Sequence, residues 1–325
     1  MIQIRKKSSL LFACLFAGVT LAAQTRPADL HLKLNHRVRF IAYGDTRFTD
    51  PSNTKAADSE ARRELVKAIA KAHPDFVTLG GDIAYNGNDP NDWKVYDSET
   101  AIWREKHILV YPALGNHDLH GDLTVSLSNY FQRYPEIQQS VYYSLHTANL
   151  LMLTLDSALD EVSGAQGDWL KSSIDTIPAN VDFLVLVLHH PPYTSSSDDK
   201  KLGGGHSARA AEQALAQFLE ERQKQIRARI VVFSGHVHNY ERHEHGGVTY
   251  FVSGGGGAHA YPIQRDPEDP FQSKEINYHY IDVKVKRGRM VATMHRLEMK
   301  NGVASWSQPD TVTISAPTAT TAQAK

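Results

Sequence analysis

The sequence predicts an α/β fold in which two packed mixed β-sheets are flanked by helices. Apolar strand-like runs alternate with amphipathic helical segments through most of the chain, and the part after residue 247 is mostly strand. The chain has 325 residues, 41% of them hydrophobic, so it can bury a sizeable core. We find neither an internal repeat nor an interdomain linker, and we expect a single domain over residues 30–315.

The individual elements follow from hydrophobic periodicity. Apolar runs of strand length lie at residues 38–43, 76–79, 107–114, 141–145, 150–155, 183–188, 229–233, 248–252, 278–285 and 290–297. The fourth and fifth runs are joined by a short polar connection, which predicts a β-hairpin, and the last two pair around Arg287-Gly288. Helical spacing appears at residues 55–72, 166–177 and 207–227.

The two ends of the chain lie outside this pattern. Residues 1–23 combine three basic residues, an uncharged apolar stretch and a small-residue end, which is typical of a secretory signal. The apolar stretch is too short to span a membrane comfortably, so we expect cleavage, a periplasmic or secreted protein, and no stable membrane insertion. Residues 316–325 are expected to be a disordered tail, with an edge strand at 311–315 as the alternative.

Charge and cysteine content restrict the possible functions. The formal net charge is −1, and loss of the signal makes it more negative by three, so no nucleic-acid partner is expected. The single cysteine, Cys14, lies within the signal, and a lipid anchor there remains an alternative. A mature chain without cysteine has no disulfide and depends on burial and metal binding for stability.

Potential metal ligands follow five of the predicted strands. A Gly-Asp pair after one strand indicates only a turn, but sites in α/β proteins gather beyond the carboxyl ends of several strands. In the last of these loops His236 and His238 are two residues apart, so both imidazoles point the same way in extended backbone. The donors are Asp45, Asp82, Tyr85, Asn116, His189, His236 and His238. This set exceeds the needs of one four-coordinate metal and predicts two ions with a bridging carboxylate.

The ordered motifs resemble the calcineurin-like metallophosphoesterase superfamily over residues 38–256. They are Gly44-Asp45, Gly81-Asp82-Ile83-Ala84-Tyr85, Gly115-Asn116-His117-Asp118, His189 and Gly235-His236-Val237-His238. Tyr85 and the run Gly235–Arg242 are similar to the purple acid phosphatase branch, as are residues 142–144, 155–157 and 166–170. The resemblance implies a four-layer sandwich and a metal-dependent hydrolase.

The resemblance also implies how the ligands are divided. Asp45, Tyr85 and His238 would bind one metal; Asn116, His189 and His236 would bind the other; Asp82 would bridge them. A free phenol titrates near about 10, so a phenolate at neutral pH requires a strongly acidic metal. We therefore expect Fe(III) at the first position and a divalent ion, Zn, Fe or Mn, at the second.

The activity implied by the resemblance is that of an acid phosphatase. Metal-bound hydroxide would attack a phosphate monoester in line, on a phosphorylated small molecule or a phosphoprotein. His117 would stabilise or protonate the leaving alkoxide, and Asp118 would orient His117. His206 and His190 are further candidate acids.

Several assignments remain open at this level. Arg47 stands where most of the superfamily has a histidine ligand, and is either a phosphate contact or a surface arginine. Residues 254–257 are four glycines that either bring backbone close to the site or form a flexible turn. His243, His245 and His259 are expected to be solvated rim residues. A phosphodiesterase or nucleotide hydrolase, and a secreted module that binds phosphorylated ligands without turnover, are the alternative functions.

Overall fold

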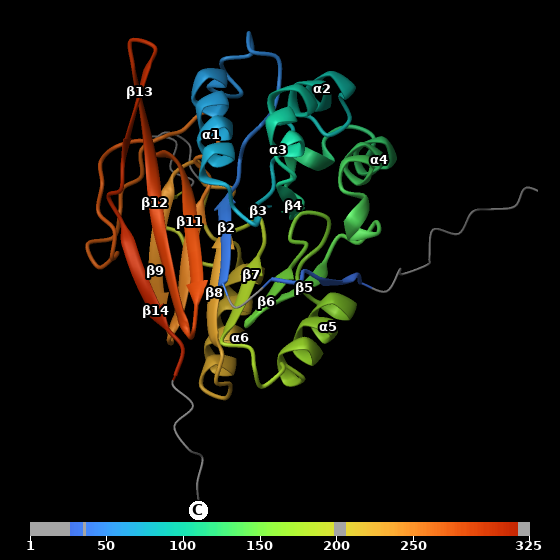
Figure 1. Ribbon diagram of the computed structural model, residues 1–325, viewed down its shortest axis with the longest axis vertical. Helices are drawn as coiled ribbons and strands as arrows, with labels where there is room; N and C mark the ends of the chain where they lie inside the picture. Colours follow the sequence, from blue (N-terminus) through green and yellow to red (C-terminus); the bar gives the residue numbers. More distant parts are fainter. Residues whose placement is uncertain (1–26, 35–36, 198–205, 318–325) are drawn as a thin grey trace, which may run out of the picture.

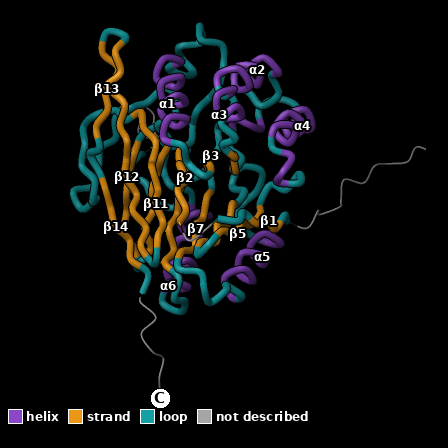
Figure 2. Tube along the Cα trace, viewed as in Figure 1, coloured by secondary structure: helices purple, strands orange, loops and turns teal. Residues whose placement is uncertain are grey.

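The computed structural model, which describes residues 27–34, 37–197 and 206–317, contains two β-sheets packed face to face with helices outside them (Figure 1; Figure 2). The predicted fold class is confirmed. The predicted signal, Cys14 and most of the predicted tail lie outside the described residues. None of the helices in the described ranges has the length and apolarity that crossing a bilayer requires.

The first sheet is built mainly from parallel strands. Its order is β1 (Asp29–His31), β5 (Tyr143–Thr147), β6 (Leu150–Thr154), β7 (Phe183–Val187), β8 (Arg229–Ser234), β10 (Val248–Ser253) and β9 (Tyr240–His245). The strands β6, β7, β8 and β10 run parallel, and β5 and β6 form the predicted hairpin. The parallel arrangement places the carboxyl ends of β7 and β8 side by side.

The second sheet combines a parallel half with an antiparallel half. Its order is β13 (Val303–Ser307), β12 (Arg289–Lys300), β11 (Tyr278–Lys286), β2 (Arg37–Tyr43), β3 (Phe76–Leu79) and β4 (Leu109–Pro112), and β14 (Thr311–Ser315) also pairs with β12. The strands β2, β3 and β4 are parallel, whereas β11 and β12 form the predicted hairpin. Residues 311–315 thus form the edge strand that was the alternative to a longer tail.

Helices cover the outer faces of the sheets (Figure 1). They are α1 (Ser59–Ala72), α2 (Pro90–Glu99), α3 (Ala101–Glu105), α4 (Leu123–Arg133), α5 (Gly164–Asp175) and α6 (Ala210–Gln223), with 3₁₀ turns η1 (His117–Leu119) and η2 (Pro135–Ile137). The sequence predicts α1, α5 and α6. Helix α1 is capped by Asp58, whose carboxylate accepts hydrogen bonds from the N–H groups of Glu60 and Ala61, as a good N-cap does.

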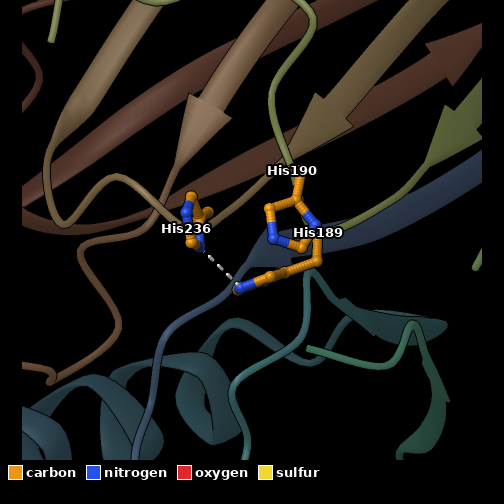
Figure 3. Close-up of side chains that lie close together, drawn as sticks. All are labelled: His189, His190 and His236. Atoms are coloured by element: carbon orange, nitrogen blue, oxygen red, sulfur yellow. Dashed lines mark hydrogen bonds between the residues drawn. The ribbon is translucent and has the colours of Figure 1, made fainter. Parts of the chain in front are cut away.

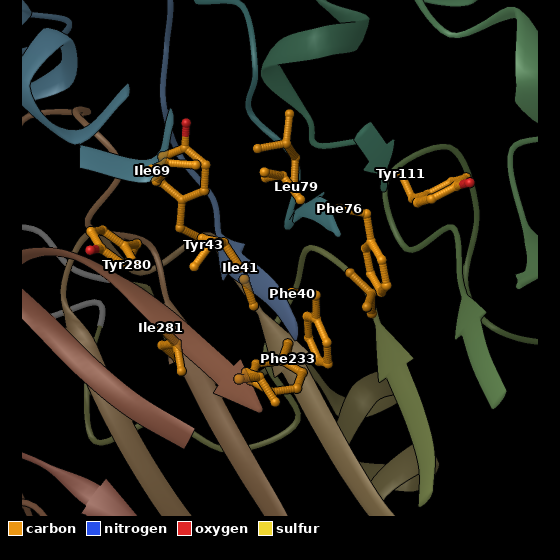
Figure 4. Close-up of a cluster of buried hydrophobic side chains, with 14 of the residues drawn as sticks. Phe40, Ile41, Tyr43, Ile69, Phe76, Leu79, Tyr111, Phe233, Tyr280 and Ile281 are labelled. Carbon is orange, nitrogen blue, oxygen red and sulfur yellow. The ribbon is translucent and has the colours of Figure 1, made fainter. Parts of the chain in front are cut away.

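The main core lies between the sheets and is rich in aromatic side chains (Figure 4). Phe40 of β2 stacks on Phe76 of β3 at 5.1 Å between ring centroids, and meets Phe233 of β8 edge-on at 5.8 Å. Phe233 belongs to the other sheet, so this contact joins the two layers. A second apolar cluster lies between the first sheet and the helices α5 and α6. Both sheets are thereby held rigidly where their parallel strands end.

Protonation of one buried histidine is expected to destabilise the fold in acid. His279 of β11 is fully buried; its Nδ1 bonds to the carbonyl of Asn277 at 2.8 Å and its Nε2 to Ser253 Oγ at 3.0 Å. Burial lowers the pKa of His279 to about 4, although the bond to Asn277 opposes this. The unfolded chain therefore binds a proton below about pH 6.5 while the folded chain does not, which costs about 3 kcal/mol by pH 4.

The variant His279→Gln is expected to lose this part of the pH dependence. Urea unfolding at pH 4.5 and pH 7 should show a smaller difference in the free energy of unfolding for the variant than for the parent chain. His107, which is exposed, provides the control, since His107→Gln should leave the pH dependence unchanged. Equal acid destabilisation in the parent chain and His279→Gln would contradict the assignment.

Candidate metal centre

The carboxyl ends of five strands, β2, β3, β4, β7 and β8, deliver the predicted ligands to one place. Their loops carry Asp45, then Asp82 and Tyr85, then Asn116, then His189, then His236 and His238. Three of these strands belong to one sheet and two to the other, so the ligands meet where both sheets end.

One group consists of Asp45, Asp82 and His238, whose ligand atoms all lie within 4.8 Å of one another. His238 Nε2 lies 3.6 Å from Asp45 Oδ1. Both atoms are buried and have no hydrogen-bond partner among the residues that the structure describes. Buried polar atoms without partners are costly, so the pair fits a cation bound between them.

The second group is centred on His189, and Figure 3 shows His189 beside His236. His189 Nε2 lies 3.1 Å from His236 Nδ1 and 3.1 Å from Asn116 Oδ1. The same nitrogen lies 3.3 Å from Asp82 Oδ1. Asp82 therefore contacts both groups, which is the position that a bridging carboxylate requires.

The imidazoles are oriented and neutral, as metal ligands must be. His189 Nδ1 bonds to the carbonyl of Gly80 at 2.7 Å, and His238 Nδ1 bonds to that of His259 at 2.9 Å. These bonds turn Nε2 of each ring toward the centre. Burial lowers the pKa of His189 and His236, and burial together with the charge of Arg47 lowers that of His238 to about 3. The rings thus keep a free lone pair at neutral pH.

The two carboxylates differ in their surroundings. Burial raises the pKa of Asp45, and the neighbouring charge of Asp82 raises it further. Burial acts in the same direction on Asp82, but His189, when it is protonated, and the permanent charge of Arg47 outweigh it and hold the pKa of Asp82 below its usual value. Two carboxylates buried together call for positive charge between them, and bound cations would supply it.

Backbone geometry at the site is unusual. Asp45, Arg47, Asp82 and His236 have φ values of 56°, 41°, 52° and 70°. Residues other than glycine seldom adopt this left-handed region, and those that do concentrate at functional sites. Backbone bonds hold two of them: Asp45 N–H donates to Gly81 O at 3.0 Å, and Arg47 N–H donates to Asp82 O at 2.9 Å.

Gly254 resolves the alternatives left open for residues 254–257. A Cβ at Gly254 would lie 2.1 Å from Val237 O and 2.8 Å from Asp45 Oδ2. The close approach of backbone to the site is therefore what the structure shows, and a side chain at this position would displace Asp45.

His117 lies at the site, but Asp118 does not orient it. The N–H of His117 donates to Asp82 Oδ1 at 2.9 Å, and its Nδ1 bonds to the carbonyl of Tyr85 at 2.7 Å. The Asp118 carboxylate instead accepts backbone hydrogen bonds from Ile83, Ala84 and Gly115. The expectation that Asp118 holds the ring is thus corrected: Asp118 fixes the loops that carry Asp82 and Asn116.

Tyr85, His190 and His206 are also close to the centre. The half-buried Tyr85 ring packs at 5.3 Å from the His117 ring. His190 bonds through Nδ1 to Ser157 Oγ at 3.1 Å, and its ring lies 4.3 Å from that of His236. Burial lowers the pKa of His190 to about 2. The His206 ring lies 4.2 Å from the His236 ring.

Arg47 belongs to the centre and not to the surface. Its Nη2 and Nε donate to Asp82 Oδ2 at 3.0 and 3.3 Å, and its side chain is 13% exposed. Of the two alternatives, the surface arginine is therefore wrong. The guanidinium places a permanent positive charge against the predicted bridging carboxylate.

Two residues at the site escaped the sequence analysis. The hydroxyl of Tyr261 accepts a hydrogen bond from His238 N–H at 3.2 Å, and the His120 ring lies 4.2 Å from that of His117. Tyr261 lies in an irregular segment 23 residues beyond His238, where no local pattern connects it with the motif. His120 stands beside the Gly115–Asp118 motif, and its proximity was the one available signal.

Comparison with known proteins gives one family and several solved structures of the same fold. The sequence model of the family described as calcineurin-like phosphoesterase matches residues 28–240. Among curated proteins, no sequence matches the chain.

Three solved structures share the fold at low sequence identity. Purple acid phosphatase PPD1 from yellow lupin (Lupinus luteus) seeds superposes with a TM-score of 0.64 at 16% identity, over 86% of this chain and 54% of that one. GAP50, the anchor in the inner membrane complex of Plasmodium, superposes with a TM-score of 0.65 at 15% identity, over 87% of this chain and 90% of that one. PhoD superposes with a TM-score of 0.61 at 13% identity, over 87% of this chain and 72% of that one. The chain thus spans about half of the lupin enzyme.

Proposed function

The chain belongs to the calcineurin-like phosphoesterase family, and we propose that it hydrolyses phosphate monoesters at a centre of two metal ions. The observation that carries the proposal is the convergence on Asp82 of the two ligand groups around His189 and His238. The buried, unpartnered Asp45 Oδ1 and His238 Nε2 support bound cations at this place.

The proposed roles follow from the positions of the side chains. One ion would be held by Asp45, Tyr85 and His238. The other would be held by Asn116, His189 and His236, and both ions would share Asp82. The bound ions would offset the charge of the phosphate and lower the pKa of a coordinated water. His117, fixed by Asp82 and the Tyr85 carbonyl, would face the leaving group.

Arg47 adds a positive charge that does not depend on metal loading. Its guanidinium fork bonds to Asp82 Oδ2 and so fixes the orientation of that carboxylate. Guanidinium groups also bind phosphate oxygens well. We propose that Arg47 positions Asp82 and contributes attraction for the phosphate dianion.

The experiment that tests the function compares two esters with metal-loaded protein. Nitrophenyl phosphate should be hydrolysed faster than bis(nitrophenyl) phosphate. Faster diester turnover would favour a phosphodiesterase or nucleotide hydrolase. Binding of inorganic phosphate without hydrolysis of any ester would favour a secreted module that binds phosphorylated ligands without turnover.

The substrate and its location are also proposals. The basic and apolar residues at 1–23 support export, with a phosphorylated small molecule or phosphoprotein outside the cytoplasm as substrate. Amino-terminal sequencing of the protein from a cell fractionation would test this, since cleavage near Ala22 or Ala23 is expected. An intact amino terminus in the cytoplasmic fraction would contradict it.

The identity of the first metal can be tested through Tyr85. If Fe(III) binds beside Tyr85, the loaded protein should absorb visible light, and Tyr85→Phe should lose this band while retaining its fold. The control is Tyr142→Phe, because the Tyr142 ring packs on Trp169 at 5.2 Å. Absorption spectra with parallel metal analysis provide the measurement. A colourless, fully active protein that contains only zinc would refute the ferric assignment.

A further inference from the structure

A second cluster of potential ligands lies on β9 and in the segment before β11. It consists of Glu241, His243 and Asp269, whose ligand atoms all lie within 4.8 Å of one another. The sequence analysis expects His243 to be a solvated rim residue, and this is wrong: His243 is 5% exposed and Glu241 is fully buried. Solvated rim side chains would not be enclosed in this way.

The imidazole of His243 lies between the two carboxylates. Its Nδ1 is 3.0 Å from Asp269 Oδ1, and its Nε2 is 3.3 Å from Glu241 Oε2. The second contact is not a hydrogen bond: Nε2 is buried and has no hydrogen-bond partner in the described part of the chain. A buried ring nitrogen facing a carboxylate oxygen without a hydrogen bond is unfavourable unless a cation lies between them.

The same geometry occurs in the metal centre described above. There, His238 Nε2 is also buried and unpartnered, at 3.6 Å from Asp45 Oδ1, and His189 Nε2 lies 3.3 Å from Asp82 Oδ1. Two atoms bound to one tetrahedral zinc at about 2.0–2.2 Å lie about 3.4 Å apart. The distance between His243 and Glu241 therefore fits two ligands of one ion.

The charges around the cluster also favour a cation. Glu244, Asp266 and Glu268 line the adjoining cavity of about 390 Å³ together with His243 and Asp269. Arg265 acts electrostatically on Glu241 and Asp269, but its hydrogen bonds go to Ser273 O and Asn239 Oδ1. Acidic groups thus outnumber the nearby basic ones.

We propose that Glu241, His243 and Asp269 bind one divalent transition cation at a site separate from the metal centre. One imidazole and two carboxylates suit zinc or manganese, whereas calcium takes oxygen ligands.

The cation would tie a loop of the metal centre to β9. Glu241 accepts hydrogen bonds from Thr194 Oγ1 at 2.6 Å and from Ser195 N–H at 2.7 Å, and Ser195 Oγ bonds to Asp269. Thr194 and Ser195 follow closely on His189 and His190 in the chain. The ion would therefore stabilise this loop without touching the substrate.

Zinc content provides the test. After equilibrium dialysis against zinc, His243→Gln should hold one ion fewer than the parent chain. Asp269→Asn should show the same loss, and it serves as the second variant in case His243→Gln does not fold. His245→Gln is the matched control, since His245 lies two residues further along β9 and is exposed. It should retain the full zinc content.

Two further measurements separate this site from the proposed function. Asp82→Asn should lower the zinc content of the metal centre and leave the ion at His243 in place, even if the protein hydrolyses no ester. Zinc should raise the melting temperature of Asp82→Asn more than that of Asp82→Asn/His243→Gln. Equal zinc in His243→Gln, Asp269→Asn and the parent chain would overturn the proposal, as would an equal loss in His245→Gln.

Discussion

Asp82→Asn is expected to lower kcat/KM for nitrophenyl phosphate by about 10³-fold or more. Asp82 is the side chain that contacts both ligand groups: its Oδ1 lies 3.3 Å from His189 Nε2, and its carboxylate lies within 4.8 Å of the ligand atoms of Asp45 and His238. Asparagine has the same shape, so the fold should persist while the shared negative charge is lost. The bound metal should decrease with the activity, because the remaining positive charges repel one another.

The control for this variant is Asp50→Asn. Asp50 lies five residues beyond Asp45, is exposed, and bonds only locally to Ser52. Its neutralisation changes the net charge by the same amount but should leave kcat/KM and metal content unchanged. Steady-state kinetics and metal analysis of Asp82→Asn and Asp50→Asn provide the measurement. Full activity and full metal content in Asp82→Asn would remove Asp82 from the centre.

The sequence predicts those elements whose signal is local. Apolar runs identified the strands β2 to β8 and β10 to β12, because each of these strands buries apolar side chains on at least one face. The helices α2 and α4 were missed for different reasons. Helix α2 buries only Asp92, Trp93 and Tyr96, so it has no continuous apolar stripe. Helix α4 does carry one, because Leu127, Tyr130 and Phe131 face the main core at helical spacing, and the sequence analysis overlooked this signal.

The edge strand β9 was missed because its sequence looks like a continuation of the site loop. Residues 240–245 carry Glu241, Arg242, His243 and Glu244, and a strand of that composition is recognised only through its partner. Pairing with β10 supplies the partner, with Arg242 opposite Phe251. Tertiary contact here outweighs intrinsic strand preference.

The predicted ligands were brought together because each follows a strand, whereas their supporting contacts are long-range. Asp118 bonds to Ile83 and Ala84, which precede it by 35 and 34 residues. Arg47 reaches Asp82 across a similar separation. Such contacts depend on how the loops fold over one another, and residue type alone does not specify them. The positive φ values of Asp45 and Asp82 likewise have no local signal.

Gly115→Ala is expected to disrupt the centre without removing any ligand. A Cβ at Gly115 would lie 2.1 Å from the backbone nitrogen of Asp82 and 2.4 Å from Asp82 Oδ1. Both contacts are far inside van der Waals distance, so the loops of β3 and β4 must separate. We expect a destabilisation of about 1–3 kcal/mol from overpacking. Activity should decrease by about 10²-fold or more, because a small displacement of the metal ligands is enough to impair catalysis.

Gly167→Ala isolates this effect from the general consequences of replacing glycine. Gly167 lies in α5, where the nearest atom to an added Cβ is Val162 O at an ordinary 3.6 Å. Alanine there should leave activity unchanged and stabilise the helix by about 0.5–1 kcal/mol. Both the melting temperature and kcat/KM should therefore be lower for Gly115→Ala than for Gly167→Ala. If Gly115→Ala had the melting temperature and the kcat/KM of the parent chain, the loops would be loose enough to accept a methyl group. Asp82 would then not be held rigidly between the two ligand groups.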